Sequence, residues 1–498
     1  MKNIADILLK EESLAFLSRL LKKFPQAKVY LVGGMVRDII LSHPSKDYDF
    51  IIAGVGPNTL EKYLKTLGQV DLVGKTFGVY KFKPKDSKLK ESIDIALPRT
   101  EHSLYLQGGY RDFNVKSDYS LPIKKDLERR DFTINAMAWD IRRKRLIDPM
   151  GGLADMAAEK IRFVGQAEER INEDYSRILR GLRFAVRLGF EFELETWRTI
   201  KLMMGRLNSL KVPREIVARE LLKSFEVDPI RAIDVFDTSG AFRVLMPEVI
   251  HMKGCCQGPT YHSEGDVWTH SRLAVEQLNS PLFKKQFPGA KSDVELSLAT
   301  FLHDIGKPYT KRTKSGNKLT YYGHETVGSR MAKDICKRLR LSSYKGLVDG
   351  DRLAWLIHYH LIIIEAPPLK IKPTTLEKYF IKSEAGDKLL KLIYADQAAS
   401  LSEEGQPCLG NFYDALELLK GIKKVGYKNK KQPKMLLNGS EIMTQLGLKP
   451  GPKIGKILHQ VRTDQLKKKI KTKKQALDLI KNRYGKKTKS PSQRRQAR

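Results

Sequence analysis

Hydrophobic residues in the first third of the chain fall into short alternating or continuous runs, which predict β-strands. The predicted strands are KVYLVGG (28–34), DYDFIIAG (47–54), GVYKFKP (78–84) and ESIDIAL (91–97). Helical spacing precedes them over residues 1–23 and returns in MVRDIILS (35–42). The segment from Arg99 to Pro122 has no clear period, and we expect a mobile loop there.

The pattern changes near residue 165, after which most segments have a helical hydrophobic period and few β-branched runs. This order predicts an α+β protein with a mixed β-sheet at the N-terminus and all-α domains after it. Polar, Gly-rich stretches at 251–265 and 402–411 indicate boundaries. We therefore expect five segments, which are 1–164, 165–250, 251–402, 403–483 and a disordered basic extension, 484–498.

Composition narrows the class of partner. The 498 residues carry a formal net charge of +34, from 91 Lys and Arg against 57 Asp and Glu. Such an excess favours a polyanion, most often a nucleic acid, although a solvated lysine surface gives the same total. No apolar run approaches the ~18 residues of a membrane helix, and the N-terminus does not resemble a signal peptide. Four cysteines without a CxxC pair indicate a reducing compartment, so we expect a cytoplasmic protein with no membrane partner.

Two carboxylates stand two residues apart at the start of the second predicted strand. Residues i and i+2 of a strand point to one face, so Asp47 and Asp49 are expected to project together. Like charges so close repel unless a cation lies between them, and divalent metals fill that place in phosphoryl transfer. Two surface aspartates at a strand edge are the alternative, since D-x-D alone is a weak signal. Asp94 is either a third carboxylate or an ordinary edge-strand residue.

A glycine pair and an arginine lie just upstream, in LVGGMVRD. Gly33 and Gly34 leave backbone N–H groups free where a strand turns into a helix, and such groups can bind a phosphate. Arg37, in the first helical turn, could hold a triphosphate. A Gly-Gly turn is common by itself, but the order strand, GG, helix and D-x-D within so short a span is rare by chance.

Further blocks follow, which are ERRDFTINAMAWD (128–140), IDPMGGLADM (147–156) and NEDYSRILRGLRFAVRLGF (172–190). In the last block Asp174 precedes one cationic helix face, made of Arg177, Arg180, Arg183 and Arg187. That face is either solvated or aimed at a triphosphate and base edges.

Together these blocks resemble the class II tRNA nucleotidyltransferases, the CCA-adding enzymes, and their bacterial poly(A) polymerase relatives. The combination of GG-x-V-R-D, D-x-D, RRDFTINA and E-D-x-x-R is highly specific, and residues 436–461 resemble the C-terminal helical region of that family. The resemblance reaches about residue 482. It implies a nucleotidyltransferase palm over 1–164, a helical neck over 165–250 and a tRNA-binding tail over 403–483.

The resemblance also implies roles for single residues. Asp47 and Asp49 would be catalytic and bind Mg²⁺. The incoming nucleotide would be contacted by Gly33, Gly34, Arg37, Arg130, Asp131, Asn135, Asp174, Arg177, Arg180 and Arg183. Asp174 and Arg177 would read C and A, because a carboxylate accepts from an exocyclic amine while a guanidinium donates to a ring nitrogen or carbonyl.

A second constellation surrounds FLHDIGKP (301–308), where five of the ten histidines fall within 91 residues. Such clustering of imidazoles with carboxylates is typical of metal sites, and composition alone leaves His358 and His360 as rival candidates. The segment 251–402 resembles the HD phosphohydrolase domain. That resemblance implies a divalent metal of unspecified identity, with the ligands His270, His303, Asp304 and Asp396, and with His324 and His358 as extra ligands of dinuclear versions.

The implied function is addition of CCA to the tRNA 3′ end from CTP and ATP without a nucleic-acid template. The HD domain would hydrolyse phosphate monoesters or 2′,3′-cyclic phosphates, or would be kept only for packing and tRNA support. Enzymes adding only CC or only A, and poly(A) polymerases, share nearly every palm block, but the HD segment and the KPGPKIG tail favour the tRNA enzyme. Intact Asp47 and Asp49 argue against a non-catalytic RNA-binding protein. No obligate protein partner is implied.

Overall fold

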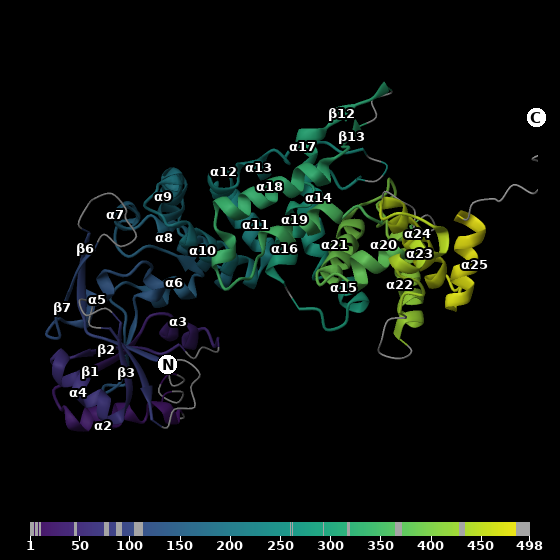
Figure 1. Ribbon diagram of the computed structural model, residues 1–498. Helices are drawn as coiled ribbons and strands as arrows, with labels where there is room; N and C mark the ends of the chain where they lie inside the picture. Colours follow the sequence, from purple (N-terminus) through teal and green to yellow (C-terminus); the bar gives the residue numbers. More distant parts are fainter. Residues whose placement is uncertain are drawn as a thin grey trace, which may run out of the picture. The chain divides into compact units, whose positions relative to one another are not determined.

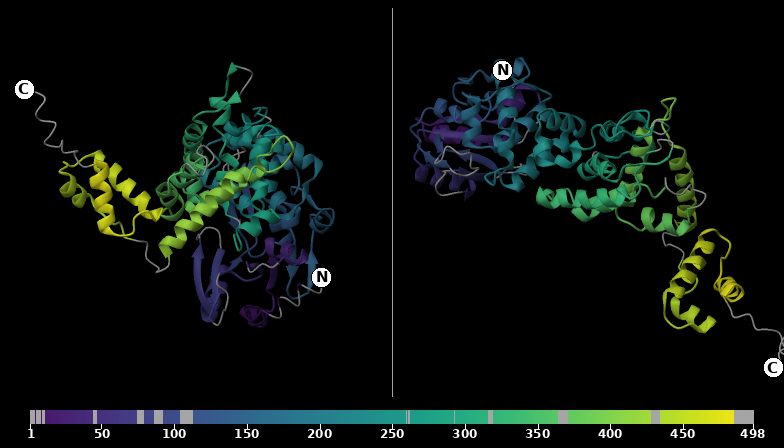
Figure 2. Two further views of the ribbon diagram at one scale, coloured as in Figure 1. Left: turned by 90° about the vertical axis from the view of Figure 1, so that its right-hand side faces the viewer. Right: turned by 90° about the horizontal axis from the view of Figure 1, so that it is seen from above.

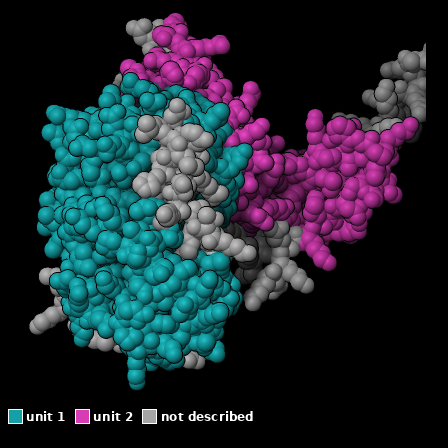
Figure 3. Space-filling view, turned by 90° about the vertical axis from the view of Figure 1, so that its left-hand side faces the viewer, with its two compact units in different colours: residues 1–250, 338–346 teal, residues 251–337, 347–498 magenta. Residues whose placement is uncertain are grey.

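The computed structural model describes residues 4, 8, 11–43, 47–73, 79–85, 92–103, 113–258, 260, 262–291, 293–315, 319–363, 371–427 and 434–484. The chain forms two compact units (Figure 3), one of residues 1–250 with 338–346 and one of residues 251–337 with 347–498. Apart from Tyr484, the predicted basic extension lies outside the described residues, and so does the middle of the predicted mobile loop.

A seven-stranded mixed sheet dominates the N-terminal region of unit 1 (Figure 1). Its order is β3-β4-β5-β2-β1-β8-β9; β2 and β5 are parallel and the other neighbouring pairs are antiparallel. The strands are β1 (Lys28–Val32), β2 (Asp49–Ala53), β3 (Gly68–Val73), β4 (Val79–Pro84), β5 (Ile93–Ala96), β8 (Ala138–Asp140) and β9 (Arg145–Ile147). The predicted α+β class is confirmed.

The central strands are buried, which explains their continuous apolar runs. Four of the five residues of β1 and of β2 are buried. The Phe16 ring of α2 (Phe16–Lys23) meets Phe50 and Phe82 edge-on, at centroid distances of 6.3 and 4.9 Å. This packing fixes the register of β2, and therefore the position of Asp49 at its start.

The other elements of unit 1 are mostly helical beyond residue 165, as predicted. Near the sheet lie η1 (Glu12–Leu14), α3 (Gly34–Ile40), α4 (Pro57–Leu67), α5 (Ile123–Glu128), η2 (Thr133–Asn135) and α6 (Gly152–Ala157). The following elements are β10 (Lys160–Ile161), α7 (Ala167–Glu173), α8 (Ser176–Leu188), β11 (Glu191–Phe192), α9 (Leu194–Met203), η3 (Met204–Asn208), α10 (Arg214–Val227), α11 (Pro229–Thr238), α12 (Ala241–Leu245), α13 (Pro247–Ile250) and η5 (Leu341–Ser343).

Unit 2 is helical apart from one short strand pair, β12 (Arg312–Thr313) and β13 (Leu319–Thr320), among its described residues. Its first helices are α14 (Val267–Gln277), α15 (Pro281–Gln286), α16 (Val294–Leu302), α17 (Lys307–Thr310), α18 (His324–Arg338) and α19 (Gly350–Tyr359). After them come α20 (Pro373–Leu376), the π-helix η7 (Glu377–Ile381), α21 (Gly386–Ala399) and α22 (Gly410–Tyr427).

Three C-terminal helices close the described chain and have a small core of their own. They are α23 (Gly439–Leu446), α24 (Pro452–Leu466) and α25 (Lys473–Tyr484), drawn in yellow in Figures 1 and 2. Their shared core contains Leu437, Ile442, Ile457, Val461 and Ile480. These helices therefore form a distinct cluster within unit 2.

Some elements differ from the sequence prediction. β6 (Arg99–Ser103) and β7 (Phe113–Ser117) pair antiparallel where a loop was expected, because a separate two-stranded ribbon needs no buried alternating face. The β2 ladder begins at Asp49, so Asp47 precedes the strand instead of sharing its face. No described helix is long and apolar enough to cross a bilayer.

Gly306 allows a close approach that a larger residue would block. A Cβ atom there would lie 2.2 Å from the His324 carbonyl oxygen and 2.7 Å from the Gly328 nitrogen, both backbone atoms of α18. We expect Gly306→Ala to force α18 outward and to destabilise unit 2 by about 1–3 kcal/mol. Thermal unfolding followed by near-UV circular dichroism measures this. Gly410→Ala is the control, because a Cβ there meets nothing within 4 Å; equal midpoints for the two variants would contradict the prediction.

Candidate functional site

A polar cavity of about 520 Å³ opens in unit 1. It is bounded by the β1–α3 turn, the start of β2, the segment 129–135 and α8. Its lining includes all twelve residues predicted for the palm site, namely Gly33, Gly34, Arg37, Asp47, Asp49, Arg130, Asp131, Asn135, Asp174, Arg177, Arg180 and Arg183. It also includes Arg187 of the predicted cationic face and four residues that were not singled out from sequence, which are Arg99, Arg129, Phe184 and Lys223.

The β1–α3 turn depends on Gly33, whose φ of +74° disfavours other residues. A Cβ at Gly33 would lie 3.1 Å from Arg130 Nη1 and 3.3 Å from Asp49 Oδ2. The bare backbone thus leaves open the space between a carboxylate and a guanidinium. A phosphate with its metal needs such a space.

Asp49 lies close to two other carboxylates, those of Asp47 and Asp94. It pairs in register with Asp94 of β5, whose Oδ1 accepts from Lys81 Nζ at 2.8 Å. Burial, together with the charges of Asp47 and Asp94, raises the pKa of Asp49 to about 7. A divalent cation would relieve this repulsion, so the carboxylates fit the metal that the sequence implies.

Arg37 is almost wholly buried, and hydrogen bonds fix the orientation of its guanidinium group. Its Nε and Nη2 donate to Asp38 Oδ1 at 2.8 and 2.6 Å, and its Nη1 donates to Asn135 Oδ1 at 2.5 Å. Arg187 of α8 donates to the other oxygen of Asp38 at 2.9 Å. Asp38 therefore joins α3 to α8 and orients two of the cavity's cations.

Asp131 supports another arginine in the same way. Its Oδ2 accepts from Nε and Nη2 of Arg180 at 2.8 and 2.6 Å, and its Oδ1 accepts from Asn135 Nδ2 at 3.1 Å. Burial acts to raise the pKa of Asp131, but Arg180 outweighs it and holds that pKa below its usual range. The Asp131 side chain is therefore charged and fixes the direction of the Arg180 guanidinium.

Besides Asp38, sequence reasoning missed Glu220 and Phe184 as supports of the α8 arginines. Buried Glu220 of α10 accepts from Arg183 Nε at 2.5 Å and from Arg219 Nε at 2.9 Å. The Phe184 ring has the guanidinium carbon of Arg183 4.2 Å from its centroid and that of Arg37 at 4.9 Å. A helical period marks Phe184 as a core residue, and nothing in the sequence around Glu220 separates it from a surface glutamate.

Asp174 and Arg177 lie at the junction of α7 and α8. Asp174 Oδ1 accepts from the Ser176 backbone N–H at 2.8 Å, while burial raises the pKa of Asp174. Arg177 Nη1 donates to Glu173 Oε2 at 2.6 Å and to the Arg170 carbonyl at 3.1 Å. Both side chains are oriented by these partners and line the cavity.

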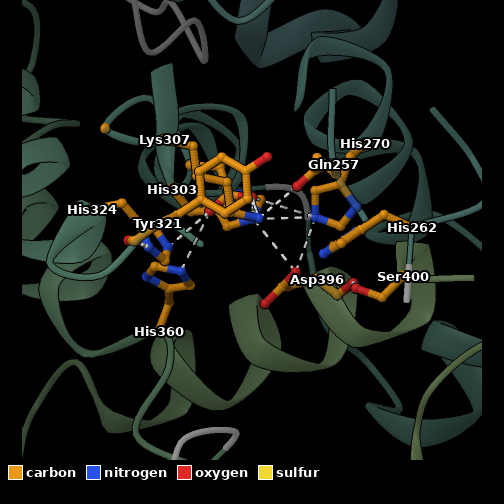
Figure 4. Close-up of polar contacts among 12 residues, drawn as sticks. Gln257, His262, His270, His303, Lys307, Tyr321, His324, His360, Asp396 and Ser400 are labelled. Carbon is orange, nitrogen blue, oxygen red and sulfur yellow. Dashed lines mark hydrogen bonds and ion pairs between the residues drawn. The ribbon is translucent and has the colours of Figure 1, made fainter. Parts of the chain in front are cut away.

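A second site lies in unit 2, where buried imidazoles and carboxylates converge (Figure 4). His270 Nε2 is 3.0 Å from Asp396 Oδ1 and 3.3 Å from His303 Nε2. His303 Nε2 is 3.3 Å from Asp304 Oδ2. These residues come from α14, α21 and the turn after α16, so the fold brings the predicted four-residue core together.

Two further histidines lie on the other side of Asp304. His324 Nε2 and His360 Nε2 are 3.2 and 3.7 Å from Asp304 Oδ1. The resemblance implied His358 at this place, but the structure places His360 there and His358 outside the cluster. Residues two apart on a helix point in nearly opposite directions, so only one of this pair can face the cluster.

The four cluster histidines are oriented alike by hydrogen bonds at Nδ1. The Nδ1 atoms of His303, His324 and His360 lie 2.7, 2.8 and 2.6 Å from backbone carbonyl oxygens, and that of His270 lies 2.7 Å from Glu264 Oε1. In the neutral imidazoles that bind a metal, each Nε2 is then the acceptor and faces the centre. The buried Nε2 atoms of His324 and His360 make no hydrogen bond among the described residues, which fits metal ligands.

Lys307 and Gln257 border the cluster (Figure 4). Lys307 Nζ is 2.6 Å from Asp304 Oδ2 and donates to Gln257 Oε1 at 2.6 Å. The Asp304 carboxylate thus faces imidazoles through both oxygens and a cation through one of them. Asp304 would therefore contribute to both groups of candidate ligands, with His270, His303 and Asp396 on one side and His324 and His360 on the other.

Three family models match successive segments of the chain. The Poly A polymerase head domain matches residues 29–162, the HD domain matches residues 266–389 and the tRNA nucleotidyltransferase domain 2 matches residues 413–480. The first match covers the sheet and the segment 129–135 of the cavity. The second covers the ligand cluster of unit 2 except Asp396.

Solved structures share the fold. The apo form II of a CCA-adding enzyme has a TM-score of 0.63 at 20% identity, covering 96% of this chain and 98% of that one. The Thermotoga maritima CCA-adding enzyme complexed with tRNA has a TM-score of 0.60 at 21% identity, with 96% and 98% covered.

Sequence similarity is closer among curated relatives. The Multifunctional CCA protein of Neisseria gonorrhoeae is 33% identical over 391 residues, which are 76% of this chain and 86% of the relative. With its palm motifs gathered in one cavity and its HD residues in one buried cluster, the chain belongs to the CCA-adding nucleotidyltransferase family of the Multifunctional CCA proteins.

Proposed function

We propose that the unit 1 cavity transfers CMP and AMP from CTP and ATP to the tRNA 3′ end, with Mg²⁺ as its metal. The supporting observation is that Asp47 and Asp49 share one cavity with the Gly33 turn and the α8 arginines. The relatives are named for CCA, which favours this substrate over others. All four cysteines are free, which fits work in the reducing cytoplasm.

In the proposed reaction the tRNA 3′-oxygen attacks the α-phosphorus, its proton is lost to solvent, and the bond to the β-phosphate breaks to release pyrophosphate. Mg²⁺ bound by Asp47 and Asp49 would neutralise charge on the phosphates and activate the attacking oxygen. Arg37, Arg180 and Arg183 already have carboxylate partners, so their remaining N–H groups can bind phosphates without reorganising. Positioning and charge then supply most of the rate.

Asp174 and Arg177 form the proposed base reader. Cytosine and adenine each carry an exocyclic amine that a carboxylate can accept, whereas uracil and guanine present an oxygen there. The second oxygen of Asp174 is available for this role because only Oδ1 caps Ser176. Partial addition of CC or A, and poly(A) synthesis, would use the same cavity, so product length separates these alternatives.

Asp49→Asn should abolish nucleotide addition with little loss of stability. The change removes a charge that repels Asp47 and Asp94, so the fold does not depend on it, whereas the metal does. The measurement is extension of tRNA lacking CCA, with Mg²⁺ and CTP, ATP or both, read as product length. Asp71→Asn, the same change at an exposed β3 carboxylate outside the cavity lining, is the control. Near-normal turnover by folded Asp49→Asn would refute the metal assignment.

Asp174→Asn should shift base choice from C and A toward U and G. The amide keeps an oxygen for the Ser176 N–H, so its NH₂ group must face the base, where it can donate to O4 or O6. The ratio of kcat/KM for UTP against CTP should rise at least tenfold. Asp148→Asn, a helix cap on Gly152 and Leu153 outside the cavity, serves as the control. An unchanged ratio at full CTP activity would place base reading elsewhere.

The unit 2 cluster supports a second candidate function, which is metal-dependent hydrolysis of phosphate monoesters or 2′,3′-cyclic phosphates. Water would attack phosphorus while the ester P–O bond breaks and the alcohol leaves with a proton. The metals would supply a nucleophilic hydroxide and polarise the phosphate. His270, His303, Asp304, His324, His360 and Asp396 would hold them, and the Lys307 ammonium beside Asp304 would face the anionic ester.

His360→Ala should lower the amount of bound metal, whereas His358→Ala should not. His360, unlike His358, lies within reach of His324 and Asp304, so its loss should empty the second position while the first stays filled. Elemental analysis of dialysed protein loaded with Mn²⁺, Co²⁺ or Ni²⁺ gives the stoichiometry, which should fall from two per chain to one. If His358→Ala lost metal and His360→Ala kept it, His358 would be the ligand instead. Loaded wild type that hydrolyses no phosphoester would favour a scaffold role for the HD fold.

A further inference from the structure

A cavity of about 770 Å³ in unit 2 lies outside both sites described above. It is bounded by the start of α18, the end of α19, α20, the π-helix η7 and α24. Ligand cavities of small molecules commonly have about 300–1,000 Å³, which includes the size of a nucleotide. A π-helix in its wall is also notable, because such turns are rare and often occur at functional sites.

One wall of the cavity is an aromatic surface. The rings of Tyr359 and Tyr379 are 4.5 Å apart between centroids, and Trp355 supports both at 5.3 and 6.2 Å. His358 meets Tyr359 edge-on at 4.6 Å. Tyr359, Tyr379 and His358 all line the cavity and are partly exposed. Flat rings of this kind bind nucleobases by stacking.

Cations surround the aromatic wall. Lys378 Nζ lies 4.7 Å from the Tyr379 ring centroid, and Lys378 and Lys382 both line the cavity and are exposed. The cavity also contains a neutralised pair, because buried Arg462 donates to buried Glu377 from Nη2 at 2.6 Å and from Nε at 3.3 Å. Lys382 Nζ also lies 3.4 Å from Glu377 Oε1, so the cavity sets three cations, Lys378, Lys382 and Arg462, against the Glu377 carboxylate. This excess of positive charge can attract a phosphate.

Glu325 lines the cavity, and its Oε2 is 3.9 Å from His324 Nδ1, beyond hydrogen-bond distance. Its Oε1 takes a hydrogen bond from Thr326 Oγ1 at 2.9 Å. Its Oε2 is buried and has no hydrogen-bond donor among the residues that the structure describes. A buried carboxylate oxygen is costly to leave without a donor, and an amine of a base or a ribose hydroxyl would supply one.

From these three features we propose that this cavity is a nucleotide-binding site, separate from the palm. The base stacks on Tyr379 or on Tyr359, whose ring planes are tilted by 45° to each other. A phosphate lies near Lys378 and Lys382, and Glu325 accepts from the base or ribose. A free mononucleotide and a nucleotide of bound RNA share this chemistry. The site also gives His358 a role, since that residue lines the cavity while His360 faces the metal cluster.

Photo-crosslinking of the full chain tests the proposal, because it reports where a ligand lies as well as whether it binds. The probes are 8-azido-AMP and a five-nucleotide single-stranded RNA containing 5-iodouridine. Adducts mapped by mass spectrometry should fall on Tyr359 or Tyr379. An adduct with 8-azido-AMP identifies a free-nucleotide site, and an adduct with the RNA alone identifies a site for an RNA nucleotide. Adducts confined to unit 1, or absent with both probes, would overturn the proposal.

Two variants sharpen the test. Tyr379→Ala should raise the Kd of the probe that crosslinks about tenfold, the usual effect of one lost base stack. Tyr322→Ala is a matched control, because Tyr322 also has a lysine over its ring, Lys314 at 4.8 Å, but does not line the cavity. Equal losses in the two variants would overturn the proposal. Circular dichroism verifies that both are folded.

The phosphate contact needs a separate readout. Lys378→Gln combined with Lys382→Gln should weaken 8-azido-AMP several-fold and leave 8-azidoadenosine, which has no phosphate, unchanged. If instead the RNA is the ligand, the double variant should flatten the salt dependence of RNA crosslinking at this position. An equal effect on nucleotide and nucleoside, or an unchanged salt dependence for the RNA, would remove the lysines from the proposed site and overturn it.

Discussion

The palm cavity depends on a buried ion pair between Arg180 of α8 and Asp131 of the segment that follows α5. Asp131 is only 8% exposed, so its charge would be costly without a partner. Both Nε and Nη2 of Arg180 donate to a single oxygen of it. Because one partner comes from beside the sheet and the other from α8, the pair sets the distance between the two walls on which the nucleotide would lie.

The same physical solution recurs around the cavity. Asp38 orients Arg37 and Arg187, and Glu220 orients Arg183. Free arginines would repel one another in so small a space, and a triphosphate would have to order them at a cost in entropy. Carboxylates on the far side of each guanidinium remove the repulsion and fix the direction of the remaining donors. The HD cluster achieves the same end with backbone carbonyls, which orient its imidazoles from behind.

The difference between residues that face a ligand and residues that orient them explains what the sequence could and could not predict. The strands β1, β2, β4 and β5 have continuous or alternating apolar runs and were predicted, whereas β8 and β9 have three residues each and give no period. Residues that face a ligand occur in short motifs and were assigned from them. Their supports, such as Asp38 and Glu220, act only through partners far along the chain, so local sequence does not separate them from surface acids.

His358 and His360 show the same limit, because composition counts both as metal ligands while helix geometry admits one. That geometry also places two sites on one helix end. A metal held by His360 restrains the last turn of α19, and a ligand against His358 and Tyr359 restrains the same turn from its other side. When binding of the metal orders this turn, binding of the cavity ligand costs less conformational entropy, and the reverse holds equally. Occupancy of the unit 2 cavity should therefore be linked to the HD centre through α19 itself.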